Sequence, residues 1–193
     1  MKNNRNGQAA ILTDADYSKI RKQIRNQKYK LLLDLAWYTG ERWGALVKLQ
    51  IKDVYNSDGT PREYINFRAR TRKATPNGKR QTRQVPVHET LAELLTAYKP
   101  ETDSLWLFPS KEGDEAMGLR WADEILRKAV ARAGLSAKGI STHSTRRSFI
   151  TKLARRGVSL ATIKKATGHT DLKVLSRYIE VSDEDVKQAI ATL

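Results

Sequence analysis

Five side chains that suit phosphodiester chemistry occur along this chain in a fixed order. They are Arg42, His143, Arg146, His169 and Tyr178. Guanidinium groups bind two phosphate oxygens at once and stay charged at neutral pH, imidazoles exchange protons, and a phenol attacks phosphorus when a base and nearby positive charge assist it. If folding brings them together, this set could cleave DNA without a metal ion and hold the broken end on a tyrosine.

His143 and Arg146 are expected on one face of a helix over 142–156, because they are three residues apart. Both lie at its N-terminal end, which already favours an anion. The pair therefore predicts a phosphate site. Taken alone, however, the same spacing suits a basic helix lying on the DNA backbone.

The other candidates also have a simpler explanation when each is taken alone. His169 follows a glycine and suits a turn or a helix cap. Tyr178 suits the buried face of an amphipathic helix, and Arg42 suits the start of a helix with a carboxylate partner. The third histidine, His88, suits a helix start and is assigned no role.

The charge of the chain predicts a polyanionic partner. Lys and Arg number 36 against 21 Asp and Glu, a net charge of +15 over 193 residues. The excess concentrates between residues 62 and 84, where one acid, Glu63, accompanies eight cations. These are Arg62, Arg68, Arg70, Arg72, Lys73, Lys79, Arg80 and Arg83. A solvated basic surface without a specific partner is the alternative interpretation.

Composition also limits the class of protein. The chain has no cysteine, which excludes disulfides and cysteine-based zinc sites and fits a cytoplasmic, nucleoid-associated protein. No apolar run approaches the roughly 18 residues of a membrane helix, and no signal-peptide core follows the polar N-terminus. No metal-binding motif or nucleotide-binding loop is found, so neither a metal nor a cofactor is expected.

The periodicity of apolar residues predicts a mainly α fold with a small antiparallel β-sheet (α+β). Helices are expected over 13–23, 28–38, 42–49, 119–133 and 142–156, and after residues 88, 159 and 182. Alternation predicts a strand over 64–70, a turn at 76–78 and a returning strand over 82–87. Residues 1–12 are expected to form a flexible basic leader.

The order Thr-Gly-x-Arg, His-x-x-Arg, Gly-His and Tyr resembles the catalytic domain of the tyrosine recombinase (phage integrase) family. The resemblance covers most of residues 13–181 and includes the Val-Pro-Val segment that ends the hairpin. The spacings of 23 residues from Arg146 to His169 and nine from His169 to Tyr178 match that family. It implies the tyrosine recombinase fold over residues 13–193.

The resemblance also implies a role for each motif residue. Arg42 and Arg146 hold the nonbridging oxygens of the scissile phosphate, His143 assists proton transfer around the tyrosine, and His169 hydrogen-bonds the phosphate. Tyr178 is the nucleophile and forms a 3′-phosphotyrosyl bond.

A lysine of the β-hairpin is implied as the group that protonates the leaving 5′ oxygen. Lys73 lies where the family's lysine usually lies, and Lys79, beyond the turn, is the alternative. The contacts expected to DNA are Arg68, Arg70, Arg72, Lys79, Arg80, Arg83 and Arg147.

Three positions depart from the family pattern. Ala45 replaces a glutamate usually found three residues after the first arginine, so a carboxylate that would hold Arg42 is missing or supplied elsewhere, for example by Glu41. Thr145 and Thr167 replace leucines. None of these changes removes a catalytic group.

Relatives of this family usually carry a further N-terminal domain that grips DNA, which is expected to be absent here. The chain is thus expected to be an excised catalytic domain or a naturally short recombinase. Its partner is double-stranded DNA. By resemblance, four copies assemble on DNA and the free protein is a monomer, with the helix after residue 182 a candidate contact between copies.

The sequence therefore predicts a site-specific DNA recombinase that needs neither metal nor ATP. Two alternatives remain open. One is a DNA-binding protein of the same fold that cleaves weakly or not at all, which the Ala45 departure motivates. The other is a nicking enzyme similar to type IB topoisomerases.

Overall fold

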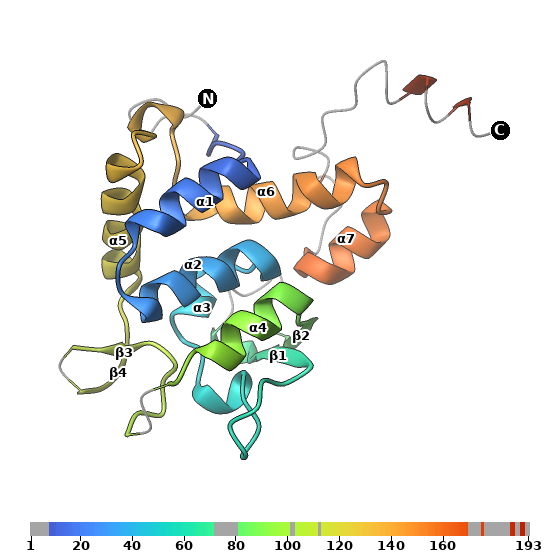
Figure 1. Cartoon of the computed structure of the whole chain (residues 1–193). Coiled ribbons are helices and arrows are strands. Elements are labelled where there is room, and N and C mark those ends of the chain that lie inside the picture. The colour runs from blue at the N-terminus through green and yellow to red at the C-terminus, as the bar shows by residue number, and fades with distance from the viewer. Residues whose placement is uncertain are drawn as a thin grey trace. The chain divides into compact units, whose positions relative to one another are not determined.

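The computed structural model describes residues 8–71, 81–100, 103–111, 113–169, 175, 186–187 and 190–191. In this part of the chain, seven α-helices and two small antiparallel sheets confirm the expected mainly α fold (Figure 1). Contacts separate two compact units, residues 1–149 and 150–193, where the sequence predicts one domain after residue 12. Each unit is described by itself.

The first unit contains most of the secondary structure. Its helices are α1 (Asp14–Gln23), α2 (Gln27–Thr39), α3 (Trp43–Leu46), α4 (Glu89–Ala97), α5 (Leu119–Arg132) and the first part of α6 (Thr142–Arg155). Its strands are β1 (Tyr64–Phe67), β2 (Arg83–Pro86), β3 (Pro109–Ser110) and β4 (Gly113–Ala116). Short 3-10 helices η1, η2 and η3 cover Ile51–Asp53, Ala69–Thr71 and Ser136–Lys138.

Helix α1 begins with a capping box. Thr13 Oγ1 accepts the Asp16 backbone N–H, and Asp16 Oδ2 accepts the Thr13 backbone N–H, both at 3.1 Å. Lys138 Nζ lies 2.7 Å from Asp16 Oδ1. Burial opposes ionisation of Asp16, but the hydrogen bonds from Lys138 and Thr13 outweigh it and lower the pKa of its carboxyl group.

Helix α2 is the centre of the first unit and contacts α1, α3, α4 and α5 (Figure 1). Its residues from Leu31 to Trp37 are all buried. It ends at Gly40, whose φ of 59° is left-handed. A Cβ at this position would also overlap the Phe149 ring, so both the backbone and the packing require glycine there.

Strand β1 is shorter than predicted. It ends at Phe67 and pairs antiparallel with β2, Phe67 opposite Arg83. The strand ends where the Arg68 guanidinium turns inward. Its Nη2 donates to the Lys48 carbonyl at 2.8 Å, and its Nε lies 3.0 Å from Asp53 Oδ2 without the alignment of a hydrogen bond.

Residues 9–12, expected in the leader, are attached to the first unit. The Leu12 N–H donates to Ser148 Oγ at 2.7 Å, the Ala10 N–H donates to the Gly139 carbonyl at 3.2 Å, and Arg147 Nη1 donates to the Ala9 carbonyl at 2.7 Å. Leu12 is buried.

The second unit contains the end of α6 and helix α7 (Leu160–Thr167). Helix α7 follows residue 159, as predicted; Ser159 caps it, and Gly168 ends it with a φ of 66°. Ile150, Ile163 and Leu175 form its small apolar cluster. Within the described parts of both units, no helix is both long and apolar enough to span a bilayer.

Candidate active site

A cavity of about 380 Å³ in the first unit brings together three of the predicted site residues, Arg42, His143 and Arg146. Other residues that line it are Glu41, Trp43, Lys48, Arg70 and Thr71. Its described lining thus carries four guanidinium or ammonium groups and one carboxylate. This excess of positive charge suits a phosphate group.

Arg42 reaches the cavity from the turn between α2 and α3. It is the N-cap residue of α3 and is partly exposed. Glu41 Oε1 accepts its backbone N–H at 2.8 Å. The turn is therefore fixed at the residue that bears the guanidinium.

Arg146 is held by the same turn. It lies on the first turns of α6 and is only 4% exposed. Its Nη1 donates to the Gly40 carbonyl at 2.8 Å and lies 3.8 Å from Glu41 Oε1. Residues of the first motif thus position the arginine of the second, more than 100 residues further along the chain.

Glu41 is a buried carboxylate, 1% exposed, with contacts to two arginines. Besides Arg146, it pairs with Arg83, whose Nη2 lies 2.7 Å from Glu41 Oε2. Arg83 was expected to contact DNA. At 7% exposure it faces the interior instead, because β2 alternates and Arg83 shares the inward face with Val85.

His143 is exposed at the start of α6, where its ring can meet a ligand in the cavity. Ser141 Oγ accepts its backbone N–H at 3.4 Å, while Ser144 Oγ accepts the Ser141 N–H at 3.0 Å. These bonds satisfy backbone donors at the helix start.

Thr145, which replaces a leucine of the family pattern, has a hydrogen-bond partner in the structure. Its Oγ1 accepts the indole N–H of Trp43 at 3.1 Å in a buried position. The threonine that replaces a leucine therefore connects α3, which Arg42 caps, to α6, which contains Arg146.

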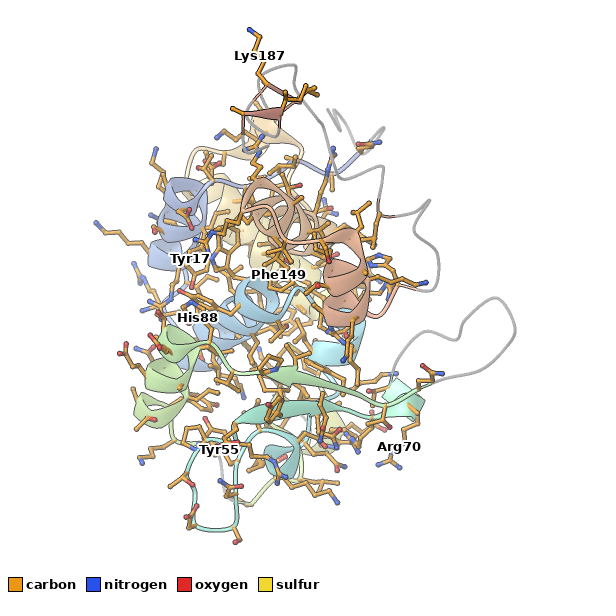
Figure 2. The ribbon with its side chains drawn as sticks, turned by 90° about the vertical axis from the view of Figure 1, so that its right-hand side faces the viewer. Tyr17, Tyr55, Arg70, His88, Phe149 and Lys187 are labelled. Carbon is orange, nitrogen blue, oxygen red and sulfur yellow. The ribbon has the colours of Figure 1, made fainter. Side chains whose placement is uncertain are left out.

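The remaining expected DNA contacts fall into three groups. Arg70 is exposed on η2 and lines the cavity; Figure 2 labels it beside the β1–β2 sheet. Arg68 and Arg147 are partly buried, with guanidinium groups engaged by the Lys48 and Ala9 carbonyls. Arg72, Lys79 and Arg80 lie outside the described residues, as do Lys73 and Tyr178, which were predicted as catalytic residues.

His169 belongs to the second unit and is 8% exposed. It follows α7, and its Nδ1 lies 2.6 Å from Thr167 Oγ1. Thr167, the third departure from the family pattern, therefore contacts the imidazole directly.

Sequence reasoning missed Lys48 at the cavity and the arginine partners of Glu41. Glu41 was considered as a partner of Arg42, but its pairing with Arg83 and Arg146 depends on contacts distant in sequence. No sequence pattern pointed to Lys48. Helix α3 ends at Leu46, so helical spacing from Arg42 does not predict where Lys48 lies. The inward position of Arg83 could have been predicted, because residues two apart in a strand face the same side and Val85 is apolar.

Two buried tyrosines are poor nucleophiles. Burial raises the pKa of Tyr17, and Asp34, which accepts its hydroxyl hydrogen at 2.6 Å, raises it further. Burial likewise raises the pKa of Tyr55. Among the described residues, no three His, Asp or Glu side chains are grouped as metal ligands.

Comparison with known proteins places these features in context. The model of the family described as "Phage integrase family" matches residues 10–185. Tyrosine recombinase XerD of Bradyrhizobium diazoefficiens is 27% identical over 96% of this chain and 58% of its own length. This chain spans 51–58% of the length of the first curated relatives that it matches.

Solved structures share the fold. The XerH site-specific recombinase bound to its difH substrate superposes with a TM-score of 0.71 at 19% identity, covering 98% of this chain and 55% of that one. The catalytic domain of bacteriophage HP1 integrase gives 0.64 at 21% identity and covers 95% of both chains.

Proposed function

This chain belongs to the phage integrase family, and we propose that it is the catalytic part of a site-specific DNA recombinase. Its substrate is double-stranded DNA, which it cleaves and rejoins through a covalent protein–DNA intermediate. The observation that supports this proposal best is the cavity where Arg42, His143 and Arg146 meet.

In the proposed reaction, the Tyr178 oxygen attacks the scissile phosphorus as the bond to the 5′ oxygen breaks. The phenol loses its proton, with His143 assisting, and the 5′ oxygen gains one from a hairpin lysine, Lys73 or Lys79. Arg42 and Arg146 bind the nonbridging oxygens and offset the charge that develops on them, while His169 hydrogen-bonds the phosphate.

The reverse reaction rejoins the strand. The 5′ hydroxyl of a DNA end attacks the phosphotyrosine, and the tyrosine leaves. The energy of the original phosphodiester is kept in the phosphotyrosyl bond, so the balance needs neither ATP nor a metal ion.

A suicide substrate tests this proposal. A duplex nicked a few nucleotides to the 3′ side of the scissile phosphate loses the short fragment that carries the new 5′ hydroxyl after cleavage, so the covalent adduct accumulates. We expect a denaturation-resistant complex with the wild-type chain, in EDTA as well, and none with Tyr178→Phe, which retains the aromatic ring. Adduct formation by Tyr178→Phe equal to that of the wild-type chain would refute the proposal.

The same assay separates the alternatives. DNA binding without an adduct would indicate a non-cleaving protein of this fold. Relaxation of supercoiled plasmid without strand exchange would indicate a nicking enzyme similar to type IB topoisomerases. Strand exchange itself is proposed to need several copies on DNA, which sedimentation of the chain with and without its DNA site would reveal.

A further inference from the structure

The hydroxyl group of Thr167 takes part in two short hydrogen bonds. Its Oγ1 lies 2.6 Å from the Ile163 carbonyl oxygen, one helical turn earlier in α7, and 2.6 Å from His169 Nδ1. Thr167 is fully buried and His169 is 8% exposed. Water therefore has little access to either bond.

The positions of the two protons follow from these distances. A carbonyl oxygen only accepts, so a separation of 2.6 Å between two oxygens requires the hydroxyl hydrogen to lie between them. A hydroxyl has a single hydrogen to donate. Thr167 Oγ1 is then an acceptor toward the imidazole, and His169 Nδ1 must carry a proton.

We propose that Thr167 is a positioning residue that holds His169 in the Nδ1–H tautomer and presents Nε2 as the nitrogen that meets the scissile phosphate. The bond fixes both the tautomer and the rotation of the ring. The part of this inference that concerns phosphate rests on the proposed function.

The chemical consequence is that one nitrogen alone exchanges protons. With Nδ1–H committed to Thr167, Nε2 accepts a hydrogen bond when the ring is neutral and donates one when it is an imidazolium. A leucine at position 167, usual in the family, could not impose this choice because its side chain lacks a polar atom.

Imidazole nitrogen NMR of the ¹⁵N-labelled chain tests the tautomer directly, at a pH where the rings are neutral. The chain has only three histidines, so His169→Gln assigns the signal. His88 is an internal control with the opposite tautomer. Its Nδ1 accepts the Thr90 backbone N–H at 3.2 Å, so the proton of the neutral ring must lie on Nε2. We expect Nδ1–H for His169 and Nε2–H for His88; a His169 ring in the Nε2–H form would overturn the inference.

Cleavage of the suicide substrate tests the positioning role. Thr167→Val keeps the shape of the side chain and removes the hydroxyl group, so we expect roughly tenfold slower cleavage, the size of effect expected for one lost buried hydrogen bond. Thr167→Ser should restore both rate and tautomer. Thr96→Val, which removes a similar hydroxyl-to-carbonyl bond in α4, should cleave normally.

The outcomes separate this inference from the proposed function. Cleavage at the wild-type rate by Thr167→Val, or no rescue by Thr167→Ser while thermal unfolding stays normal, would contradict the positioning role. A wild-type chain that forms no adduct would refute the recombinase proposal, and the tautomer would still be decided by the spectrum.

Discussion

At the scale of single residues, the geometry of the cavity depends on a carboxylate at the variable position of the Thr-Gly-x-Arg motif. Glu41 is buried between the guanidinium groups of Arg83 and Arg146 and accepts the Arg42 backbone N–H. Removing one member of a buried ion pair leaves an uncompensated charge, which destabilises a protein by about 3–5 kcal/mol. Glu41 therefore affects both stability and the geometry of the site.

Glu41→Gln should lower the free energy of unfolding by about 3 kcal/mol, because the buried Arg83 loses the negative charge that lies 2.7 Å from it. The double variant Glu41→Gln/Arg83→Met also removes the positive charge of Arg83 and should regain most of the stability, as measured by urea denaturation. Its single-turnover cleavage should stay low, because Arg146 still lacks its carboxylate. If the double variant cleaves at the wild-type rate, Glu41 does not position Arg146.

Lys48 is exposed and lines the cavity beside the arginines. We expect Lys48→Ala to weaken DNA binding for all sequences alike and to reduce the slope of log affinity against log salt by about one. Lys19→Ala, which removes an exposed lysine on α1 away from the cavity, is the matched control. A slope that changes equally in both variants would remove Lys48 from the interface.

At the scale of elements, the end of α2 decides where Arg146 lies, because the Gly40 carbonyl accepts its Nη1–H. Phe149, labelled in Figure 2, packs against this turn. Any side chain at Gly40 would meet the aromatic ring and strain a left-handed backbone.

Gly40→Ala should lower the free energy of unfolding by about 2–5 kcal/mol, from backbone strain of about 1–2 kcal/mol plus overpacking of about 1–3 kcal/mol. Its cleavage rate should also fall. Gly59→Ala isolates the backbone effect, since Gly59 has a φ of 81° and no atoms near an added Cβ. Equal losses in the two variants would show that the Phe149 contact is unimportant.

The cap of α1 makes stability depend on pH. The pKa of Asp16 is lower in the folded chain than its ordinary value of 3.8. The stabilisation is therefore complete above that ordinary value and is lost as pH falls through the folded-state pKa. Denaturation of the wild-type chain and Asp16→Asn from pH 7 to pH 3 should show a difference in unfolding free energy that shrinks below about pH 4. A constant difference would contradict the assignment.

Local patterns predicted the helices well and the sheet less well. Thr13, Gly40, Ser159 and Gly168 act through neighbours in sequence, so the ends of α1, α2 and α7 could be recognised without a structure. The end of β1 could not, because Arg68 leaves the strand to meet Lys48 and Asp53. The candidate site was predicted from the spacing of its motifs. The partners that hold its arginines could not be predicted in this way, because they are distant in sequence.

At the scale of the whole chain, the positive charge suits the DNA substrate that we propose. The net charge is +15, and the cavity concentrates part of it around Arg42 and Arg146. Because this charge favours contacts to phosphate, those contacts should contribute much of the proposed binding to DNA. We expect its affinity for DNA to fall steeply with salt; an affinity that is insensitive to salt between 50 and 200 mM, the range over which about 10³-fold losses are usual, would contradict this.

Mass spectrometry of the trapped protein–DNA complex tests the central claim most directly. After nuclease and protease digestion, we expect one modified peptide, with a nucleotide joined through its 3′ phosphate to Tyr178. A nucleotide on any other residue, or joined through a 5′ phosphate, would contradict the assignment of Tyr178 as the nucleophile.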